Sequence, residues 1–470
     1  MSGVRGALLW RGEDGYEEAR VGRVFNARRP ERYPAGVLLA ADEEDVAAGV
    51  RLARARGLRV SVRAGGHSWA AWSVRDDALL IDLGSLRELS YDPATHVATA
   101  SPAIKGGEEL APFLESHGRS FPGGHCPSVG IGGFLLQGGQ GWNSRTWGWG
   151  CENVVGVDVV TADGELVHAS ETENEDLLWA ARGAGPGYPA IVTRFHLRTH
   201  PRPAAMVQDT WTFALEDLEP LLVWLHELLP TLERVVEPVI AATRLPDVPL
   251  HDGVERPDGP VLLLHTTAMC ARAEDADGVF APLDGCPLAG RALGHVRGPT
   301  TIAEENAAQA VQNPEGHRYA VDCTWSDATA EQLAPLLKDV WGGLPTEHSF
   351  SIWYGWAPVR PLPDMAFSIE ANVYLATYVI SADEADDERH RTWVHEQMGR
   401  VAAVEGRGVY LGDTDFTRRP DRFLSPAAFA RLEAIRAARD PGGVICGYLI
   451  ADGAELNAAP ARRPGTAPAR

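Results

Sequence analysis

The chain has 470 residues, with 43 Lys and Arg against 64 Asp and Glu, and a net charge of −21 at neutral pH. Such an acidic chain is not expected to bind nucleic acid or an anionic membrane, because both attract basic surfaces. Its 45% hydrophobic and 23% charged residues are typical of packed globular proteins, and the length predicts more than one domain.

The N-terminus carries a four-residue apolar run, residues 7–10, which is too short for a signal peptide. No apolar stretch approaches the length that spans a bilayer. The six cysteines stand singly, without a CxxC pair, and the fifteen histidines show no HExxH spacing. We therefore expect a reduced, cytoplasmic protein without disulfides, membrane contact or a metal site.

Residues 36–83 predict a strand, a helix and further strands. Asp42 is a suitable helix N-cap with Asp45 three residues on, and Gly57 is a suitable helix stop. Residues 154–167 predict a β-hairpin around Ala-Asp-Gly, and residues 189–200 predict a strand. The proline-rich segment 200–205 predicts a domain boundary.

After this boundary, helical segments alternate with longer strands, which predicts an α+β arrangement of an antiparallel sheet backed by helices. The predicted helices include residues 215–232 and 330–341, and the strands include 259–270, 348–357 and 371–380. Side-chain alternation along the strand within 348–357 would place Trp353 and Tyr354 on opposite faces. Residues 423–441 predict a capped amphipathic helix. We expect domains over residues 1–205 and 206–405, a C-terminal segment over 406–457, and a disordered tail over 458–470.

Two glycine-rich segments stand out as candidate sites. The first is Arg63-Ala64-Gly65-Gly66-His67-Ser68 at a strand end, which taken alone indicates only a tight turn with a surface histidine. The second is residues 123–141, GGHCPSVGIGGFLLQGGQG, which has too much glycine for an ordinary helix or strand. It lacks the third glycine of a Rossmann fingerprint and the Gly-Lys-Ser/Thr of a P-loop.

Together the two segments resemble the berberine-bridge-enzyme-like group of the vanillyl-alcohol-oxidase superfamily, in its branch with doubly attached flavin. The likeness covers most of the first 200 residues. It implies a PCMH-type two-subdomain FAD-binding domain, built from residues 1–205 and 406–457, and a substrate domain over 206–405. It also implies that His67 bonds to the flavin 8α-methyl carbon and Cys126 to ring carbon C6, positions that suit a neutral imidazole and a thiolate.

The same resemblance implies further FAD contacts. Backbone and hydroxyl donors around Gly65 would bind the pyrophosphate, and Val129, at a position linked to oxygen access, favours an oxidase. The expected cofactor contacts are Arg63, Ala64, Gly65, Gly66, His67, Ser68, Cys126, Val129, Gly130, Gly132, Gly133, Gly138, Gly139, Gly141 and Ile191.

The family's late Tyr-x-Asn-Tyr motif matches Tyr410-Leu411-Gly412-Asp413, which retains only the first tyrosine. Tyr410 is therefore the candidate catalytic base, unless it is merely a packed strand aromatic. Asp413 is either a substitute polar group or solvated. Leu375 stands at the family's other base position, so no base is expected there.

Other aromatic residues near the expected flavin are candidate substrate contacts. These are Trp142, Trp147 and Trp149, whereas Glu370 is expected to be exposed. The cysteines other than Cys126 are expected to be buried and inert.

The sequence thus predicts an FAD-dependent oxidase that oxidises a bulky sugar or natural product and reduces O₂ to H₂O₂. Two alternatives remain open at this stage. One is a flavin dehydrogenase with another electron acceptor, and the other is a flavin-carrying binding protein without turnover. Peroxide formation separates the first alternative from the oxidase, and anaerobic bleaching of the flavin separates the second. The oligomeric state is not predicted.

Overall fold

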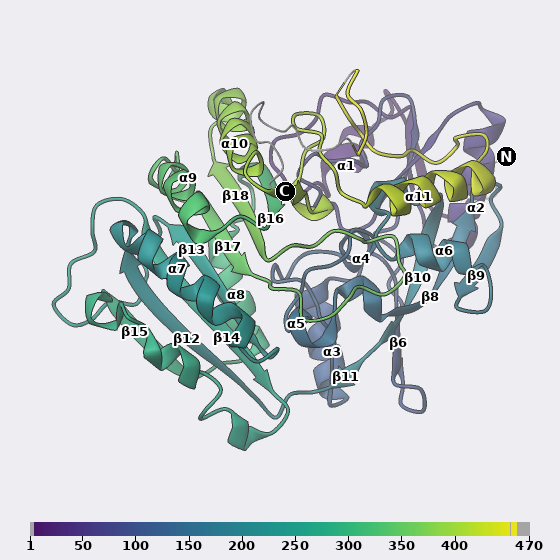
Figure 1. The fold of residues 1–470 in the computed structure, drawn as a ribbon. Helices are drawn as coiled ribbons and strands as arrows, with labels where there is room; N and C mark the ends of the chain where they lie inside the picture. The colour runs from purple at the N-terminus through teal and green to yellow at the C-terminus, as the bar shows by residue number, and fades with distance from the viewer. Residues whose placement is uncertain (1–3, 452, 458–470) are drawn as a thin grey trace, which may run out of the picture.

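A computed structural model describes residues 4–451 and 453–457 (Figure 1), so the expected tail, residues 458–470, lies outside the described residues. The chain begins with a four-stranded sheet in the order β1-β2-β4-β3, in which β1 is antiparallel to β2 and the other pairs are parallel. Its elements are β1 (Ala7–Trp10), α1 (Tyr16–Val21), β2 (Gly36–Leu39), α2 (Glu43–Ala55), β3 (Val60–Arg63) and β4 (Leu79–Asp82).

The strand–helix–strand prediction for residues 36–83 is confirmed. The Asp42 carboxylate caps α2 by accepting a hydrogen bond from the backbone N–H of Asp45 at 3.0 Å. Gly57 follows the helix with φ +67°, a conformation that favours glycine. Val46 and Val50 lie about one turn apart and are fully buried against this sheet.

A five-stranded antiparallel sheet follows, in the order β5-β6-β10-β8-β9. The predicted hairpin is confirmed, because β8 and β9 pair with Val160 opposite Leu166. The elements of this part are β5 (Leu89–Asp92), β6 (Val97–Ala100), α3 (Ala111–Ser116), β7 (Arg119–Ser120), α4 (Ile131–Leu136), α5 (Ser144–Trp147), β8 (Val154–Thr161), β9 (Leu166–Ser170), α6 (Glu175–Ala181), β10 (Ala190–Arg198) and β11 (His200–Pro201).

The expectation that segment 123–141 forms neither helix nor strand is wrong for six residues, because Ile131–Leu136 forms α4. Close packing explains a glycine inside this helix. A Cβ at Gly132 would lie 2.7 Å from the Pro102 Cβ and 2.9 Å from the Ala64 Cβ. Contact with these neighbours therefore favours glycine, although glycine weakens a helix by about 1 kcal/mol relative to alanine.

Residues 205–408 form an eight-stranded antiparallel sheet in the order β15-β12-β14-β13-β17-β18-β16-β19, which confirms the α+β class. Helices α7, α9 and α10 cover one face of it (Figure 1). The elements are β12 (Ala205–Ala214), α7 (Leu218–Leu228), β13 (Val236–Thr243), β14 (Val261–Cys270), β15 (Gly294–Pro299), α8 (Ile302–Gln312), β16 (Arg318–Ser326), α9 (Ala330–Gly342), β17 (Phe350–Gly355), β18 (Val373–Ser381), α10 (Asp387–Ala402) and β19 (Gly406–Gly408). Helix α7 is shorter than the predicted 215–232 because a 3₁₀ turn precedes it and another follows it. The turn that follows contains Pro230, which has no N–H to continue the helical hydrogen bonds.

Side chains of this large sheet alternate between its two faces. Ile240, Leu264 and Trp353 are fully buried in the core that the sheet shares with the helices. Their neighbours His265 and Tyr354 point to the opposite side, toward the N-terminal sheets. The predicted separation of Trp353 and Tyr354 onto different faces is therefore confirmed.

The C-terminal segment returns to the N-terminal sheets. Helix α11 (Pro426–Arg439) lies beside α6 (Figure 1), and Arg439 forms an ion pair with Asp176 at 2.6 Å. Beyond the helix, Ile445 pairs with Val60 of β3 in a parallel bridge. Residues far apart in the sequence thus border one region between the sheets.

Candidate functional site

The two glycine-rich segments meet through their backbones. A Cβ at Gly65 would lie 2.7 Å from the Gly130 nitrogen, and one at Gly130 would lie 2.7 Å from the Gly65 Cα. Only glycine permits this approach at both positions. The loop after β3 and the loop before α4 therefore form one continuous wall.

This wall borders a cavity of about 640 Å³ that lies between the N-terminal sheets and the bare face of the large sheet. Its volume falls within the range of roughly 300–1,000 Å³ typical of ligand and cofactor sites. Alternate residues of β13, β14 and β17 form the opposite wall: Glu237, Val239, Ala241, Leu263, His265, Thr267, Phe350, Ile352 and Tyr354.

His67 lines this cavity and its ring stacks on Phe25, with 4.2 Å between the ring centroids. Burial, aided by the Lys105 charge, lowers the pKa of His67 to about 4. The imidazole is therefore neutral near pH 7, which leaves a nitrogen lone pair available for bond formation.

Cys126 lines the same cavity from the second loop. Burial raises the pKa of its thiol, while the Ser128 hydroxyl, 3.7 Å from the sulfur, acts in the opposite direction. The thiol is thus mostly protonated near pH 7, and its nucleophilic thiolate form increases as the pH rises.

Most of the other expected cofactor contacts also line the cavity. The Ser68 Oγ accepts a hydrogen bond from the Trp72 N–H at 3.2 Å and keeps its own proton for donation. The cavity-lining members of the expected set are Arg63, Ala64, Gly65, Gly66, His67, Ser68, Cys126, Val129, Gly130, Gly132, Gly133 and Ile191.

Arg63 reaches the cavity, but its guanidinium is committed to the protein. It forms an ion pair with Asp82 and donates to the carbonyl oxygens of Ala19 and Arg20. Because the charged group is occupied in this way, only the rest of Arg63 is available to a cofactor.

Gly138, Gly139 and Gly141 lie behind the cavity wall rather than on it. A Cβ at Gly138 would lie 2.8 Å from the Phe367 ring, and one at Gly141 would lie 2.4 Å from the Pro122 carbonyl oxygen. These glycines permit close packing behind the loop.

Tyr410 lies on the cavity wall, and its Oη accepts hydrogen bonds from two backbone N–H groups, Gly139 at 3.1 Å and Gln140 at 3.3 Å. Among the described residues the Tyr410 proton has no acceptor, so it is free for a ligand. Burial and the nearby Asp413 raise the pKa of the phenol, whereas the two N–H groups stabilise the phenolate.

The alternative that Asp413 is solvated is wrong. This carboxylate is buried and accepts hydrogen bonds from the Tyr374 and Tyr378 hydroxyls at 2.6 and 2.8 Å and from the Trp69 Nε1 at 3.0 Å. Burial raises its pKa. Asp413 thus holds aromatic side chains in place around the cavity.

Three other expectations need correction. Trp149 does not line the cavity, because it is fully buried beside Trp356 and Phe367, although Trp142 does line it. Glu370 is not exposed: it accepts a hydrogen bond from the Trp356 Nε1 at 2.9 Å, and burial raises its pKa to about 6. Cys446 is only half-buried and lines the cavity, which its position in the sequence did not indicate.

A further group of polar side chains, which no motif in the sequence indicated, lies on the large-sheet side of the cavity. The His265 Nε2 lies 3.0 Å from the Glu305 Oε2, and its Nδ1 lies 2.8 Å from the Thr210 hydroxyl. His125 of the second loop is buried near this pair, and burial lowers its pKa to about 4. Thr210, His265 and Glu305 come from β12, β14 and α8, so no local sequence motif predicts that they lie together.

The fold and the cavity define a PCMH-type FAD-binding protein. Residues 34–170 match the family model described as an FAD binding domain. FAD-linked oxidoreductase janO of Penicillium janthinellum is 34% identical over 454 residues, covering 95% of this chain and 98% of that protein. The chain therefore belongs to the FAD-linked oxidoreductases.

Solved structures share this fold. BBE-like 1 of Physcomitrella patens has a TM-score of 0.80 at 17% identity and covers 98% of both chains. The glucooligosaccharide oxidase of Acremonium strictum has a TM-score of 0.76 at 21% identity, over 97% of this chain and 98% of that one. The fold that the two glycine-rich segments implied, that of the berberine-bridge-enzyme-like proteins, is thus confirmed. In the described part of the chain, no helix has both the length and the apolar character to cross a membrane.

The residues present fit FAD. A Cβ at Gly133 would meet no atom of the described chain within 4 Å, so the wall is open there for a flat ring. Several buried polar atoms of the cavity lining have no hydrogen-bond partner among the described residues. They include the Ser61 Oγ, Trp72 Nε1, Gln140 Nε2 and Tyr188 OH. Buried polar groups are usually satisfied, so these atoms indicate a polar ligand.

Proposed function

We propose that the protein is an oxidase whose FAD is bonded to both His67 and Cys126, and that it oxidises a bulky small molecule with O₂ as the electron acceptor. The observation that carries this proposal is that a neutral imidazole and a thiol share one wall of one cavity. The glucooligosaccharide oxidase of similar fold is described as carrying a 6-S-cysteinyl, 8α-N1-histidyl FAD. The proposed attachment uses the same two residue types.

The protein's own groups orient the cofactor. His67 and Cys126 fix the ring system, while Ser68 and the N–H groups beside Gly65 and Gly66 bind phosphate oxygens. When bound, FAD supplies the acceptor for the hydride that the substrate loses. The compact Val129 side chain leaves access for O₂ next to Cys126.

Tyr410 is the proposed catalytic base. Burial and Asp413 keep the phenol protonated in the resting protein, so Tyr410 gives up its own proton to solvent before it acts as a base. The N–H groups of Gly139 and Gln140 stabilise the resulting phenolate, and its Oη then takes the proton from the substrate hydroxyl. Asp413 is a positioning residue: it holds Tyr374 and Tyr378 beside this position.

The cavity wall formed by the large sheet favours a bulky substrate with an apolar body and a few polar groups. Ile352, Tyr354 and Val239 supply apolar and aromatic surface. Thr210 and the His265–Glu305 pair supply polar surface. A sugar oligomer or a polycyclic natural product meets this description. Relatives include a xylooligosaccharide oxidase, 39% identical over 181 residues, and the FAD-linked oxidoreductases described above.

The experiment is anaerobic mixing of the purified yellow protein with cello- and xylo-oligosaccharides and with polycyclic secondary alcohols. A substrate should bleach the flavin absorbance, and air should restore it with one H₂O₂ per substrate. The His67→Ala/Cys126→Ala double variant should not retain flavin after acid precipitation. Bleaching without peroxide would instead show a dehydrogenase, and a wild-type protein that binds no flavin would contradict the proposal.

A further inference from the structure

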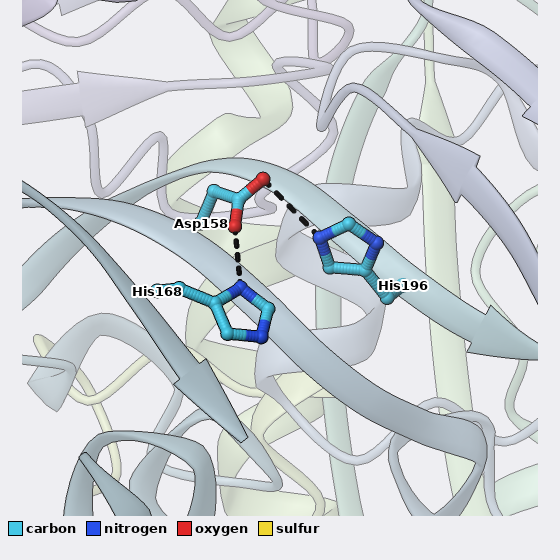
Figure 2. A group of neighbouring side chains, drawn as sticks. All are labelled: Asp158, His168 and His196. Carbon is cyan, nitrogen blue, oxygen red and sulfur yellow. Dashed lines mark hydrogen bonds and ion pairs between the residues drawn. The ribbon is translucent and has the colours of Figure 1, made fainter. Parts of the chain in front are cut away.

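Two histidines and one aspartate gather on the five-stranded sheet, outside the cavity. Asp158 of β8 lies between His168 of β9 and His196 of β10 (Figure 2). Its Oδ1 is 2.6 Å from the His168 Nδ1, and its Oδ2 is 3.2 Å from the His196 Nε2. The three candidate ligand atoms all lie within 4.8 Å of one another.

Strand pairing brings these residues together, although His168 is 10 residues and His196 is 38 residues from Asp158 in the sequence. His168 is the direct partner of Asp158 in the β8–β9 ladder, and His196 is the partner of Gly156 in the β8–β10 ladder. Gly156 leaves room for both rings: a Cβ there would lie 3.2 Å from the His168 ring and 3.4 Å from the His196 ring. The glycine therefore lets the two imidazoles converge on one carboxylate.

The surroundings suit a cation. The Arg194 Nη1 lies 3.6 Å from the Asp158 Oδ2, but Arg194 is itself paired with Glu43 and Glu88. With neutral imidazoles, the group of three carboxylates and one guanidinium is net negative. The Asp158, His168 and His196 side chains are 24%, 42% and 24% exposed, so an ion can reach them from solvent.

One ligand also has a supporting contact. The His196 Nδ1 lies 3.1 Å from the Thr99 hydroxyl, which fixes the ring with its Nε2 toward Asp158. Partners of this kind orient metal-bound histidines in known sites. The His168 ring faces the Asp158 carboxylate with its Nδ1.

We propose that Asp158, His168 and His196 form a binding site for a divalent transition-metal ion of the Zn²⁺ type. Two imidazoles and one carboxylate are common ligands of such ions, with remaining positions open to water. Ligand atoms around a tetrahedral ion bound at ~2.1 Å lie ~3.4 Å apart, so small side-chain shifts suffice. The ion would join three adjacent strands, and it is independent of the flavin.

The test uses the purified, flavin-containing protein after treatment with a chelator and dialysis. Calorimetric titration with Zn²⁺ should show one ion per chain with micromolar or tighter affinity, and Zn²⁺ should raise the apparent Tm. Asp158→Asn and His168→Gln should each weaken binding at least tenfold while keeping the flavin spectrum. His317→Gln, which alters a partly exposed histidine elsewhere, should bind as the wild type does.

Two results would overturn the proposal. One is a wild-type protein that binds no Zn²⁺ at 100 µM, on the order of a hundred times the expected Kd; the three residues would then form only a hydrogen-bonded triad. The other is a titration whose stoichiometry and affinity are the same in Asp158→Asn and His168→Gln as in the wild type. The wild-type titration decides the first result even if a variant fails to fold.

Discussion

Substitutions of Gly133 test whether FAD lies against α4. A small side chain should raise the stability of the apoprotein, and a large one should reduce the binding of flavin. Gly133 lies within α4, and a Cβ there would meet no described atom within 4 Å on the cavity side. Alanine is favoured over glycine in a helix by about 1 kcal/mol. Gly133→Ala should therefore raise the apoprotein's free energy of unfolding by up to about 1 kcal/mol, or its apparent Tm by ~1–2 °C.

The larger Gly133→Phe variant should bind much less flavin, because its ring would occupy the space that fits the cofactor. We expect covalent flavin, measured as absorbance per chain after acid precipitation, to fall at least tenfold. Gly399→Ala is the matched control for Gly133→Ala. Gly399 also lies in a helix, and a Cβ there would meet only the Arg419 Cδ, at 3.8 Å. This variant should gain similar stability and keep its flavin. A Gly133→Phe protein with wild-type flavin content would refute the placement of FAD against α4.

Three other predictions concern single groups. Tyr410→Phe should slow anaerobic flavin reduction by ~10²–10⁴-fold without loss of colour, measured by stopped flow, whereas Tyr91→Phe, which alters a tyrosine outside the cavity, should not. Burial raises the pKa of Glu370 to about 6, so the stability that this carboxyl contributes is present below about pH 4.5 and is lost as the pH rises through 6. Glu370→Gln should therefore raise the free energy of unfolding at pH 8 by on the order of 2 kcal/mol and leave it unchanged at pH 4.5. Urea unfolding at the two pH values measures the difference. The rate of covalent attachment, measured when apoprotein is reconstituted with FAD, should depend on pH differently in the two single variants. In His67→Ala the rate should rise about tenfold from pH 7 to pH 8, because only the thiolate form of Cys126 reacts, whereas in Cys126→Ala it should not change. Equal pH dependence in both variants would contradict the assigned protonation states.

Local patterns in the sequence predicted much of the fold. The cap at Asp42, the hairpin over 154–167 and the alternation of Trp353 and Tyr354 each depend on neighbouring residues, and the structure confirms all three. The end of α7 was missed because the apolar pattern continues through Pro230, whereas the regular hydrogen bonding does not.

The meeting of His67 and Cys126 at one cavity was also predictable, because each lies in a distinctive glycine-rich context. The His265–Glu305 pair and the three donors to Asp413 were not, since each joins residues from separate strands and helices. Glu370 and Trp149 were misplaced because burial depends on packing between distant segments. The Asp158, His168 and His196 group was not predicted either, because strand pairing brings these residues together and their spacing in the sequence is not typical of a metal site.

The central claim is that one flavin is bonded to the two residues on the cavity wall. The most direct measurement is mass spectrometry of peptides from the wild-type protein after denaturation in acid and removal of free flavin. We predict a single species in which the peptides containing His67 and Cys126 are joined through one FAD. Recovery of both peptides unmodified, from a protein that has lost its yellow colour, would contradict the claim.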